Sequence, residues 1–370
     1  MRKGWEYKKL GDCTQILDSQ RKPVTKRDRK SGIYPYYGAT GIQDYVDKYI
    51  FDGRYVLVGE DGAKWSSFTQ SAFIIEGKTW VNNHAHVLRT NDFLVDSFLV
   101  YFLNYSDLDS YISGAIIRKL TQASLRNIDI PLPPKSTQLA IVSELDKINE
   151  LIRLKKEQLK DFDNLAQSLF YEMFGDPVEN EKGWEVKKLG EIAKSAIGLT
   201  YKPENVTEEL SGTVVLRSSN IQNSILDFND IVRVNVLVKE DKMVNDGDIL
   251  MCSRNGSFRL VGKVALIKGL KERMSYGAFM TIIRSPYNPY LFEYFKTPAF
   301  RQYLITGKTT TVNQITVKML NNLTLPLPPL SLQRLFAQRI EQIEREKSEV
   351  QKSIQDLETL LASRMQYWFE

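Results

Sequence analysis

Apolar residues recur every three or four positions in two long segments, which predicts two amphipathic helices. The segments cover residues 138–174 and 333–370, neither contains proline or glycine, and Lys and Glu lie between the apolar positions. This is the heptad pattern of a coiled coil. The second pattern keeps the phase of the first after a shift of 195 residues. We therefore expect the two helices to pair with each other in an antiparallel arrangement.

The residues predicted to form the seam between the helices share one heptad phase. They are Ile141, Leu145, Ile148, Ile152, Leu159, Phe162, Phe336, Ile340, Ile343, Val350, Ile354 and Leu357. Lys155 interrupts the first seam, and Lys347 and Arg364 interrupt the second. A polar residue in a seam disfavours misaligned pairings, so we expect Lys155 and Lys347 to set the register. In the alternative, each helix packs separately on its own domain.

The sequence contains two copies of one plan. Lys-Gly-Trp-Glu-Tyr-Lys-Lys-Leu-Gly at residues 3–11 recurs with one change at 182–190, and the Pro-Leu-Pro-Pro of 131–134 recurs at 326–329. Each Pro-Leu-Pro-Pro run is followed by a glutamine and a predicted helix. Between these matched boundaries the two halves share no obvious run, which indicates a common scaffold that holds two different recognition surfaces.

These patterns define the expected architecture. Strand-like runs such as 54–58 and 72–75 fill the interiors between the matched boundaries. We predict an α+β fold: two globular mixed α/β domains joined by two long antiparallel coiled-coil helices, with a pseudo-twofold internal repeat. The expected divisions are a first domain at 1–134, a central helix at 135–174, a second domain at 175–329 and a C-terminal helix at 330–370.

Composition narrows the class of protein. The 370 residues are 42% hydrophobic and 26% charged, as in ordinary globular proteins. No apolar run is long enough for a membrane span, and the first residues lack the apolar core of a signal peptide. Cys13 and Cys252 form no Cys-x-x-Cys pair, which favours a reducing cytoplasm. The net charge of +5 is compatible with a nucleic-acid partner.

The first interior contains a basic segment, residues 19–30, followed by tyrosines and glycines. Basic side chains beside glycine and tyrosine suit DNA phosphates, although a solvated charged loop has the same composition. The candidate contacts of this interior are Arg21, Lys22, Lys26, Arg27, Arg29, Lys30, Tyr36, Tyr37, Thr40, Lys64, Asn82, Asn83, His84 and His86.

His84 and His86 are the two histidines of the chain. Alternation along a strand would point both to one face, where they could supply two metal ligands. The spacing offers no third ligand, so we predict no metal and no cofactor. Structural histidines and contacts with bases or phosphates are the remaining interpretations.

The second interior places Arg, Asn and Ser where strand-like runs end. Such side chains suit base edges, with Arg matching guanine and Asn matching adenine. The candidates are Arg217, Ser218, Asn220, Arg254, Asn255, Ser257, Arg259, Tyr276, Lys308 and Asn313. We single out Arg217, Arg254 and Asn255, together with the segment 82–86, for sequence specificity.

Signatures of catalysis are weak. The glycines before Lys263 have the wrong spacing for a phosphate loop. Asp176, Glu185 and Lys187 imitate a nuclease set, but the first copy has no acidic residue matching Asp176. We therefore predict no catalytic residues, with a metal-dependent nuclease as a minor alternative.

The arrangement resembles the specificity subunit (HsdS) of type I restriction–modification systems over essentially the whole chain. The resemblance is carried by the two starts, the two Pro-Leu-Pro-Pro boundaries with their helices, and runs such as Asn-Asn-His-Ala-His at 82–86. It implies two target recognition domains that each read one half of a split site in double-stranded DNA. It also implies a helical spacer that docks two modification subunits, which bind S-adenosylmethionine and methylate adenine. Restriction subunits join in the full complex, and none of this catalysis belongs to the chain itself.

Two further interpretations stay open. One is a coiled-coil scaffold or adaptor with no role on DNA. The other is a specificity subunit that serves a different methyltransferase–nuclease arrangement. One departure from the family is that the chain ends directly after the second helix, so the second copy lacks a counterpart of Gly175-Asp176-Pro177. We expect this difference to affect partner docking.

Overall fold

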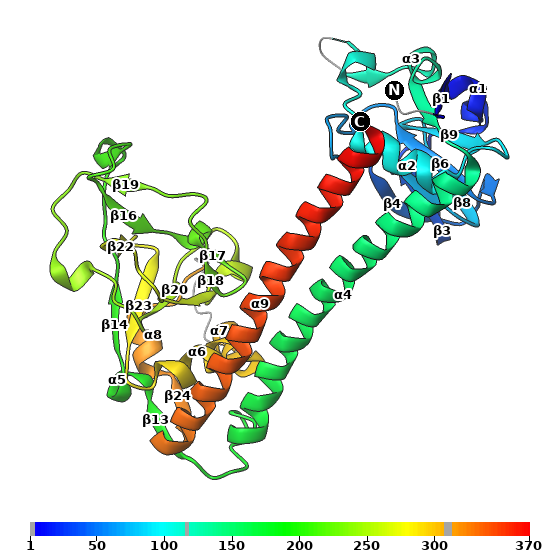
Figure 1. The fold of residues 1–370 in the computed structure, drawn as a ribbon. Helices are drawn as coiled ribbons and strands as arrows, with labels where there is room; N and C mark the ends of the chain where they lie inside the picture. The colour runs from blue at the N-terminus through cyan, green and yellow to red at the C-terminus, as the bar shows by residue number, and fades with distance from the viewer. Residues whose placement is uncertain (1–3, 115–117, 307–312) are drawn as a thin grey trace. The chain divides into compact units, whose positions relative to one another are not determined.

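The computed structural model describes residues 4–114, 118–306 and 313–370. It divides into two compact units (Figure 1). Unit 1 comprises Met1–Gln158 with Val350–Glu370, and unit 2 comprises Leu159–Glu349. The division cuts both long helices, so each unit holds one globular part and one half of each helix.

Unit 1 is built on two four-stranded sheets. In the first sheet the strand order is β2 (Thr14–Ile16), β9 (Ala85–Thr90), β6 (Tyr55–Gly59) and β7 (Ala72–Ile75). In the second it is β4 (Gly41–Val46), β3 (Ser31–Gly38), β8 (Lys78–Val81) and β5 (Phe51–Asp52), with β3 and β8 parallel. The central strand β6 is buried at every position, as its unbroken run Tyr-Val-Leu-Val-Gly predicts.

Unit 2 repeats the first sheet of unit 1, and part of the second, with a different sequence. Its first sheet has the order β14 (Lys194–Ile197), β23 (Met280–Arg284), β20 (Ile249–Cys252) and β21 (Val264–Leu266). Its second has the order β15 (Val206–Thr207), β19 (Arg233–Val234), β16 (Thr213–Leu216) and β22 (Met274–Tyr276), with β16 and β22 parallel. The first sheets of the two units therefore share their strand order, and the second sheets share a parallel pair flanked by an antiparallel strand but differ in their fourth strand. The duplication thus extends beyond the matched boundaries.

Smaller elements complete the two units. Unit 1 adds β1 (Glu6–Lys9), α1 (Leu10–Cys13), α2 (Asp96–Tyr105), β10 (Ile112–Ser113), β11 (Lys119–Leu120), α3 (Gln122–Arg126) and β12 (Asp129–Leu132). Unit 2 adds β13 (Glu185–Lys188), α5 (Leu189–Ile192), β17 (Ile221–Gln222), β18 (Ile225–Leu226), α6 (Asn288–Lys296), α7 (Pro298–Thr306), α8 (Val317–Asn322) and β24 (Thr324–Leu327).

The repeated sequence motifs have one structural role in both units. The Glu-x-Lys-Lys part of each run forms a strand, β1 paired with β12 in unit 1 and β13 paired with β24 in unit 2, and the Leu-Gly that follows begins a short helix. The glycine of the run is required because α1 and α3 approach closely: a Cβ on Gly11 would lie 3.0 Å from the Cβ of Arg126. The same holds for Gly190, whose Cβ would lie 2.9 Å from that of Asn321.

The glutamine after each Pro-Leu-Pro-Pro run holds the start of a long helix. Gln138 is fully buried and donates to the Pro133 carbonyl at 2.9 Å, and Gln333 donates to the Pro328 carbonyl at 2.7 Å. Each bond ties the first turn of the helix to the chain that enters it. The glutamine after each Pro-Leu-Pro-Pro run therefore anchors the start of a long helix.

The two long helices, α4 (Lys135–Phe174) and α9 (Leu330–Phe369), pair in both units. In unit 1, Glu144 bonds Arg364 and Lys156 lies 2.8 Å from Glu358. In unit 2, Asp163 lies 2.8 Å from Lys347, and the rings of Phe170 and Phe336 are 6.0 Å apart. Since residue numbers rise along α4 as they fall along α9, the helices are antiparallel, and separate packing is wrong.

The predicted seam positions are buried or half-buried. Those fully buried are Ile141, Leu145, Ile148, Ile152, Phe336, Ile343, Val350 and Ile354, and those half-buried are Leu159, Phe162, Ile340 and Leu357. Lys347, which interrupts the second seam, is compensated by Asp163 and Glu344. Burial disfavours its charged form, but these two carboxylates outweigh burial and raise the pKa of Lys347.

The cores lie between sheets and helices. In unit 1, Ile141 and Leu145 of α4 and Met365 of α9 pack with the α2 residues Phe98 and Leu103. In unit 2, α4 and α9 pack against α6 and α7 through an aromatic cluster that includes Phe170, Phe174, Tyr290 and Phe336. Among the described helices, none is both long enough and apolar enough to cross a membrane.

Candidate nucleic-acid interface

Three strands end at one edge of each unit, and the loops that follow them contain most of the specificity candidates. In unit 1 the strands are β3, β6 and β8, joined beyond their ends by the bond from Asn82 N–H to the Tyr37 carbonyl at 3.0 Å. In unit 2 they are β16, β20 and β22, where Gly277 N–H donates to the Leu216 carbonyl at 2.9 Å. We call this the reading edge of each unit.

The reading edge of unit 2 gathers predicted residues from distant parts of the sequence. Asn255 Nδ2 donates to Ser218 Oγ at 3.2 Å, and Asn313 Nδ2 donates to the Gly256 carbonyl at 2.8 Å. Arg254 is exposed, and its guanidinium carbon lies 5.2 Å from the centre of the Phe279 ring. Arg217 is half-buried and lies 2.8 Å from Asp230. Asn255 and Asn313, which are 58 positions apart in the sequence, therefore lie at the same edge with Ser218.

The reading edge of unit 1 carries different side chains on the same frame. His84 Nδ1 lies 2.5 Å from Asp61 Oδ1, and both groups are partly exposed. The basic segment starts beside this pair, because Lys22 N–H donates to the Val81 carbonyl at 3.4 Å. Lys22, Lys26 and the neighbouring cations that stay exposed extend from that point.

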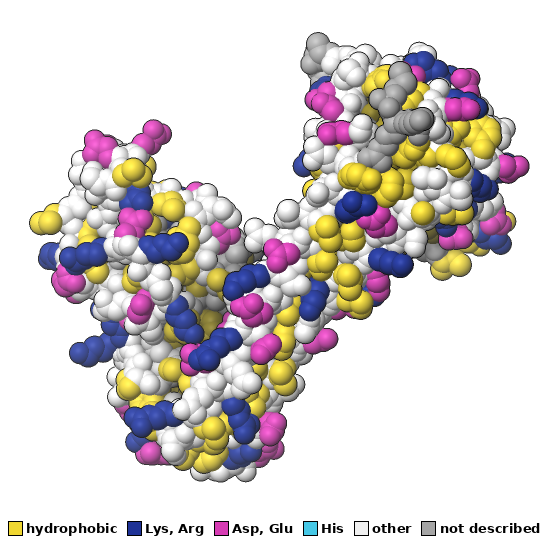
Figure 2. Space-filling model, viewed as in Figure 1, with side chains coloured by type: hydrophobic (Ala, Val, Ile, Leu, Met, Phe, Trp, Pro, Cys, Tyr) yellow, Lys and Arg dark blue, Asp and Glu magenta, His cyan; other side chains and the backbone are white. Residues whose placement is uncertain are grey.

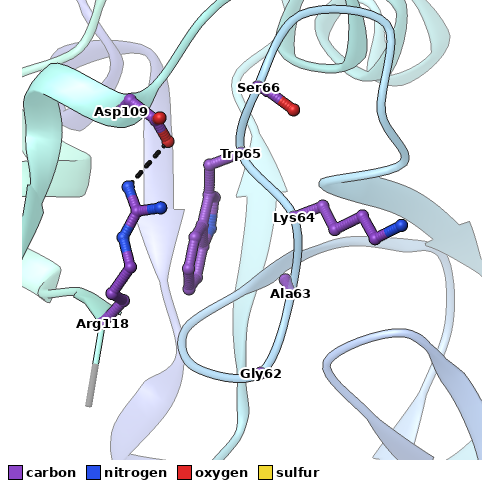
Figure 3. A pocket seen from close by; sticks show the side chains of 7 residues that line it. All are labelled: Gly62, Ala63, Lys64, Trp65, Ser66, Asp109 and Arg118. Atoms are coloured by element: carbon purple, nitrogen blue, oxygen red, sulfur yellow. Dashed lines mark hydrogen bonds and ion pairs between the residues drawn. The ribbon is translucent and has the colours of Figure 1, made fainter. Parts of the chain in front are cut away.

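A shallow pocket adjoins this edge (Figure 3). It is lined by the loop 62–66 together with Asp109 and Arg118. Arg118 lies 2.9 Å from Asp109 and 6.0 Å from the Trp65 ring, while Lys64 projects from the other side of the loop. Lys64 is exposed, as a phosphate contact requires.

The predicted residues differ in exposure. Those exposed are Lys22, Lys26, Arg27, Lys30, Thr40, Lys64, Asn83, His84, Arg254, Ser257 and Arg259, and those half-buried are Arg21, Arg29, Tyr37, Arg217, Ser218, Asn255 and Asn313. Lys308 lies outside the described residues. On the face drawn in Figure 2, Lys and Arg are interspersed with Asp and Glu in both units. On this face the basic side chains therefore form no continuous patch.

Five predictions are corrected by burial. Tyr36, Asn82, His86, Asn220 and Tyr276 are at most 2% exposed, so their side chains present no surface to DNA. Two of them build the turns of the reading edge. Asn82 Oδ1 accepts from His84 N–H at 2.8 Å, and Asn220 Oδ1 accepts from Arg217 N–H at 2.8 Å. These asparagines position candidate readers without touching the target.

The two histidines do not share a face, which corrects the strand expectation. His84 precedes β9 in a turn and is exposed, whereas His86 lies inside β9 and is fully buried. His86 Nδ1 lies 2.6 Å from Asp18 Oδ2, and its Nε2 lies 2.8 Å from the Leu120 carbonyl. Both ring nitrogens therefore have structural partners.

His86 belongs to an ion network under the reading edge of unit 1. Arg21 is 2.5 Å from Glu60 and 3.4 Å from Asp18, and Lys119 is 2.6 Å from Glu60. Burial raises the pKa of Asp18, but the His86 hydrogen bond and nearby charges outweigh burial, so this pKa is lowered overall. The pKa of Glu60 is likewise lowered, because hydrogen bonds from Lys119 and Arg21 outweigh its burial. Arg21 is thus held within the protein by this network.

Asp18, Glu60 and His86 could offer three metal ligands within 4.8 Å of one another. Arg21 and Lys119 already neutralise these carboxylates, and a cation there would meet two positive charges. The cluster is therefore a network of ion pairs in which the carboxylates already have positive partners from the protein. It holds the end of β6 against the loop that contains Arg21.

Arg29 is also occupied within the protein. Its guanidinium carbon lies 4.2 Å from the centre of the Tyr36 ring, and Nε donates to the Val24 carbonyl at 3.1 Å. These contacts fold the basic segment back on β3. Lys26 and Arg27 stay exposed at its tip, where phosphates can reach them.

Asp176, Glu185 and Lys187, which imitate a nuclease set, have structural roles in the scaffold. Lys187 pairs with Glu185 on β13, and at the equivalent place on β1 Lys8 lies 3.3 Å from Glu6. The repeat of this pair in both units argues for a role in the strand rather than in catalysis. Asp176 accepts a hydrogen bond from Val178 N–H at 2.7 Å, as a turn residue does.

Sequence reasoning missed Phe279, Asp61, Trp65 and Arg118. The available signal for Phe279 was an aromatic residue directly after a Gly-Ala turn, between two apolar strands. Asp61 and Arg118 carried no local signal, because the fold brings them to the reading edge from separate loops.

The chain contains two copies of a mixed α/β unit, and paired helices join them. Each copy carries polar side chains at the same edge. These features define a class of duplicated recognition proteins. The family model described as the type I restriction modification DNA specificity domain matches residues 2–161 and 181–359. The chain belongs to this family of DNA specificity subunits, which are the non-catalytic subunits of type I restriction–modification systems.

Relatives and solved structures agree with this assignment. The S.HindORF215P specificity subunit of Haemophilus influenzae is 41% identical over 146 residues, which are 40% of this chain and only 38% of that protein. The MjaVIII specificity subunit of Methanocaldococcus jannaschii is 23% identical over 96% of this chain and 92% of its own length.

Two solved structures share the fold. The S subunit of a type I restriction-modification system from M. genitalium has a TM-score of 0.55 and 14% identity, covering 98% of this chain and 95% of its own. A chain from a study of complex assembly and conformational transition in the type I R-M system has a TM-score of 0.61 and 19% identity, covering 100% and 98%.

Proposed function

We propose that this chain selects a bipartite DNA target for a type I restriction–modification complex, with each unit reading one half-site. The observation that carries the proposal is the pair of equivalent reading edges with different chemistry. Unit 1 presents Asp61 and His84, and unit 2 presents Arg254 and Phe279. One frame with two sets of side chains is what recognition of two different half-sites needs.

Affinity and specificity come from different residues in this proposal. Exposed cations such as Lys26 and Arg27 contact phosphates and supply binding that depends on salt but not on sequence. Arg254 and Asn255 contact base edges in the major groove, where Arg matches guanine and Asn matches adenine. Asp61 is an acceptor for the amino group of cytosine or adenine.

The paired helices dock the modification subunits. Their outer faces carry leucines that a water-facing helix does not need: Leu151 is 47%, Leu154 is 46% and Leu165 is 50% exposed on α4. Apolar side chains are visible along the helices in Figure 2. Exposed apolar patches of this kind mark protein–protein contacts. Two modification subunits, which carry S-adenosylmethionine and methylate adenine, and restriction subunits in the full complex are the proposed partners.

The setting of this activity is the cytoplasm, where chromosomal DNA is available in bacteria and archaea. Cys13 and Cys252 are both free and buried, as befits a reducing compartment. The chain itself selects the site, and methyl transfer takes place on the modification subunits.

Mapping of methylated adenine across a genome tests the proposal. Cells that express the neighbouring methyltransferase subunit are compared with and without this chain. We expect a split motif that appears only with the chain. Absence of any motif, together with DNA binding that does not respond to salt, would instead support a scaffold without a role on DNA.

A further inference from the structure

Phe279 is an exposed aromatic side chain at the tip of the reading edge of unit 2. It is 57% exposed, although the next residue, Met280, is buried in β23. Exposing an aromatic ring to water forgoes the free energy that burial would supply. Phe279 also lies beside Arg254, one of the residues predicted to contact bases. Its place beside Arg254 at the reading edge makes it a candidate contact with the target.

The backbone fixes where the ring lies without help from the ring itself. The Phe279 carbonyl accepts from Ser253 N–H at 2.9 Å, from Ser253 Oγ at 3.0 Å and from Arg254 N–H at 3.1 Å. These three bonds join the tip of the β22–β23 connection to the end of β20. Because they involve only the main chain of Phe279, the side chain is free to change without loss of the loop conformation.

One face of the ring is already covered. The Arg254 guanidinium carbon lies 5.2 Å from the ring centre, as in a cation–π contact. A side chain that wedges between stacked bases inserts into the stack, and the guanidinium on one face of Phe279 stands in the way of that insertion. Phe279 instead offers its other face and its edge, which suits an apolar group that projects from a groove. In the major groove that group is the C5-methyl of thymine.

We propose that Phe279 is a specificity-determining residue that contacts the C5-methyl of a thymine beside the base read by Arg254. This proposal rests on the proposed function, because it assumes that unit 2 reads DNA. It adds a residue that the composition of the basic and polar loops did not indicate. It also explains why an aromatic residue and an arginine from two different loops are held side by side.

The first experiment uses the full chain with its methyltransferase subunits. Methylated-adenine motifs are mapped for the wild type, for Phe279→Ala and for Phe279→Leu, with Phe228→Ala as a matched control on an exposed phenylalanine of the same unit. We expect Phe279→Ala to relax one T·A position in one half-site only, and Phe279→Leu to keep a partial preference. Phe228→Ala should leave the motif unchanged.

The second experiment isolates the methyl group. Binding of the complex is measured on the wild-type site and on the same duplex with that thymine replaced by deoxyuridine, which lacks only the methyl. Because the wild type would no longer bury that methyl, we expect it to bind the deoxyuridine duplex with about fourfold lower affinity. Phe279→Ala should bind both duplexes equally, and its own melting temperature shows that it is folded.

Three results would overturn the proposal and leave the proposed function intact. The first is a motif that Phe279→Ala leaves unchanged, and the second is a relaxed position that is not T·A. The third is an equal loss of affinity in wild type and variant when thymine is replaced by deoxyuridine. Absence of any chain-dependent motif in the wild type would overturn the proposed function as well. The two failures are therefore told apart by the wild-type control.

Discussion

His84 and Phe279 occupy equivalent positions in the two units. The His84 carbonyl accepts from Glu60 N–H at 2.8 Å, and the Phe279 carbonyl accepts from Ser253 N–H at 2.9 Å. In each case the donor is the first residue after the central strand, β6 or β20. The residues after these donors, Asp61 and Arg254, both form an isolated bridge to the segment that precedes α3 or α8. The main chain is repeated, and the side chains that face outward are not.

Arg254 and Lys26 should respond differently to removal of their side chains. Arg254→Ala should cost about 1–3 kcal/mol of binding on the cognate site and relax one half-site, because it removes a base contact. Lys26→Ala should weaken all DNA alike and reduce the salt slope by about one, because it removes a phosphate contact. Binding measured on cognate and scrambled duplexes over a salt series distinguishes them. Uniform weakening by Arg254→Ala would reduce that residue to a phosphate contact.

The ion network of unit 1 should make the protein sensitive to acid. The folded-state pKa values of Asp18 and Glu60 lie below their ordinary values of 3.8 and 4.5. Their stabilisation is therefore complete above those ordinary values and is lost as pH falls through the lowered folded-state pKa values. Melting temperatures followed from pH 7 downward should fall in that window.

A substitution in the network separates it from general acid effects. Asp18→Asn should destabilise the protein by about 3 kcal/mol at neutral pH, because it leaves buried partners without their counter-charge. Its melting temperature should then change less with acid than that of the wild type. Asp109→Asn, at an exposed pair with Arg118, should change stability by less than about 1 kcal/mol. Parallel acid profiles for wild type and Asp18→Asn would contradict this account.

Two leucines six residues apart on α4 should differ in their contribution to the unfolding free energy. Leu145 is fully buried in the seam, so Leu145→Ala should cost about 2–5 kcal/mol of unfolding free energy. Leu151 is half exposed, and Leu151→Ala should change that energy by less than about 0.5 kcal/mol. Denaturant titrations of the full chain measure both.

Substitution of the exposed leucines on α4 should reduce binding of the modification subunits. The double variant Leu151→Glu, Leu154→Glu should fold as the wild type does but recover less modification subunit on co-purification, because it places charges on the proposed docking face. Normal recovery with the double variant would place docking elsewhere on the chain.

Helix length should set the distance between half-sites. Deleting seven residues from the facing stretches of both helices keeps the seam in phase and shortens each helix by about 10 Å. We expect the unread spacer between half-sites to shorten by about three base pairs, since successive pairs are about 3.4 Å apart. Loss of activity would also fit, whereas an active variant with an unchanged spacer would refute a ruler role.

The sequence predicted the scaffold better than the reading edges. Heptads report burial at regular intervals, so Leu145 and Ile343 were placed in the seam from spacing alone. The shared topology of the interiors left no signal, because strand order depends on apolar runs that many sequences satisfy. His86 and Asn220 were misjudged since polar residue type does not reveal whether partners are buried beside it. Asp61 and Arg118 reach their edge only through long-range pairing.

The central claim is that each unit reads its own half-site through side chains carried on a common frame. Replacing residues 14–127 with the equivalent residues 193–322 gives a chain in which both units carry the unit 2 interior. Adenine methylation is then mapped in cells with the modification subunits. The account predicts a motif in which both half-sites are the former unit 2 half-site. Retention of the original unit 1 half-site would contradict it.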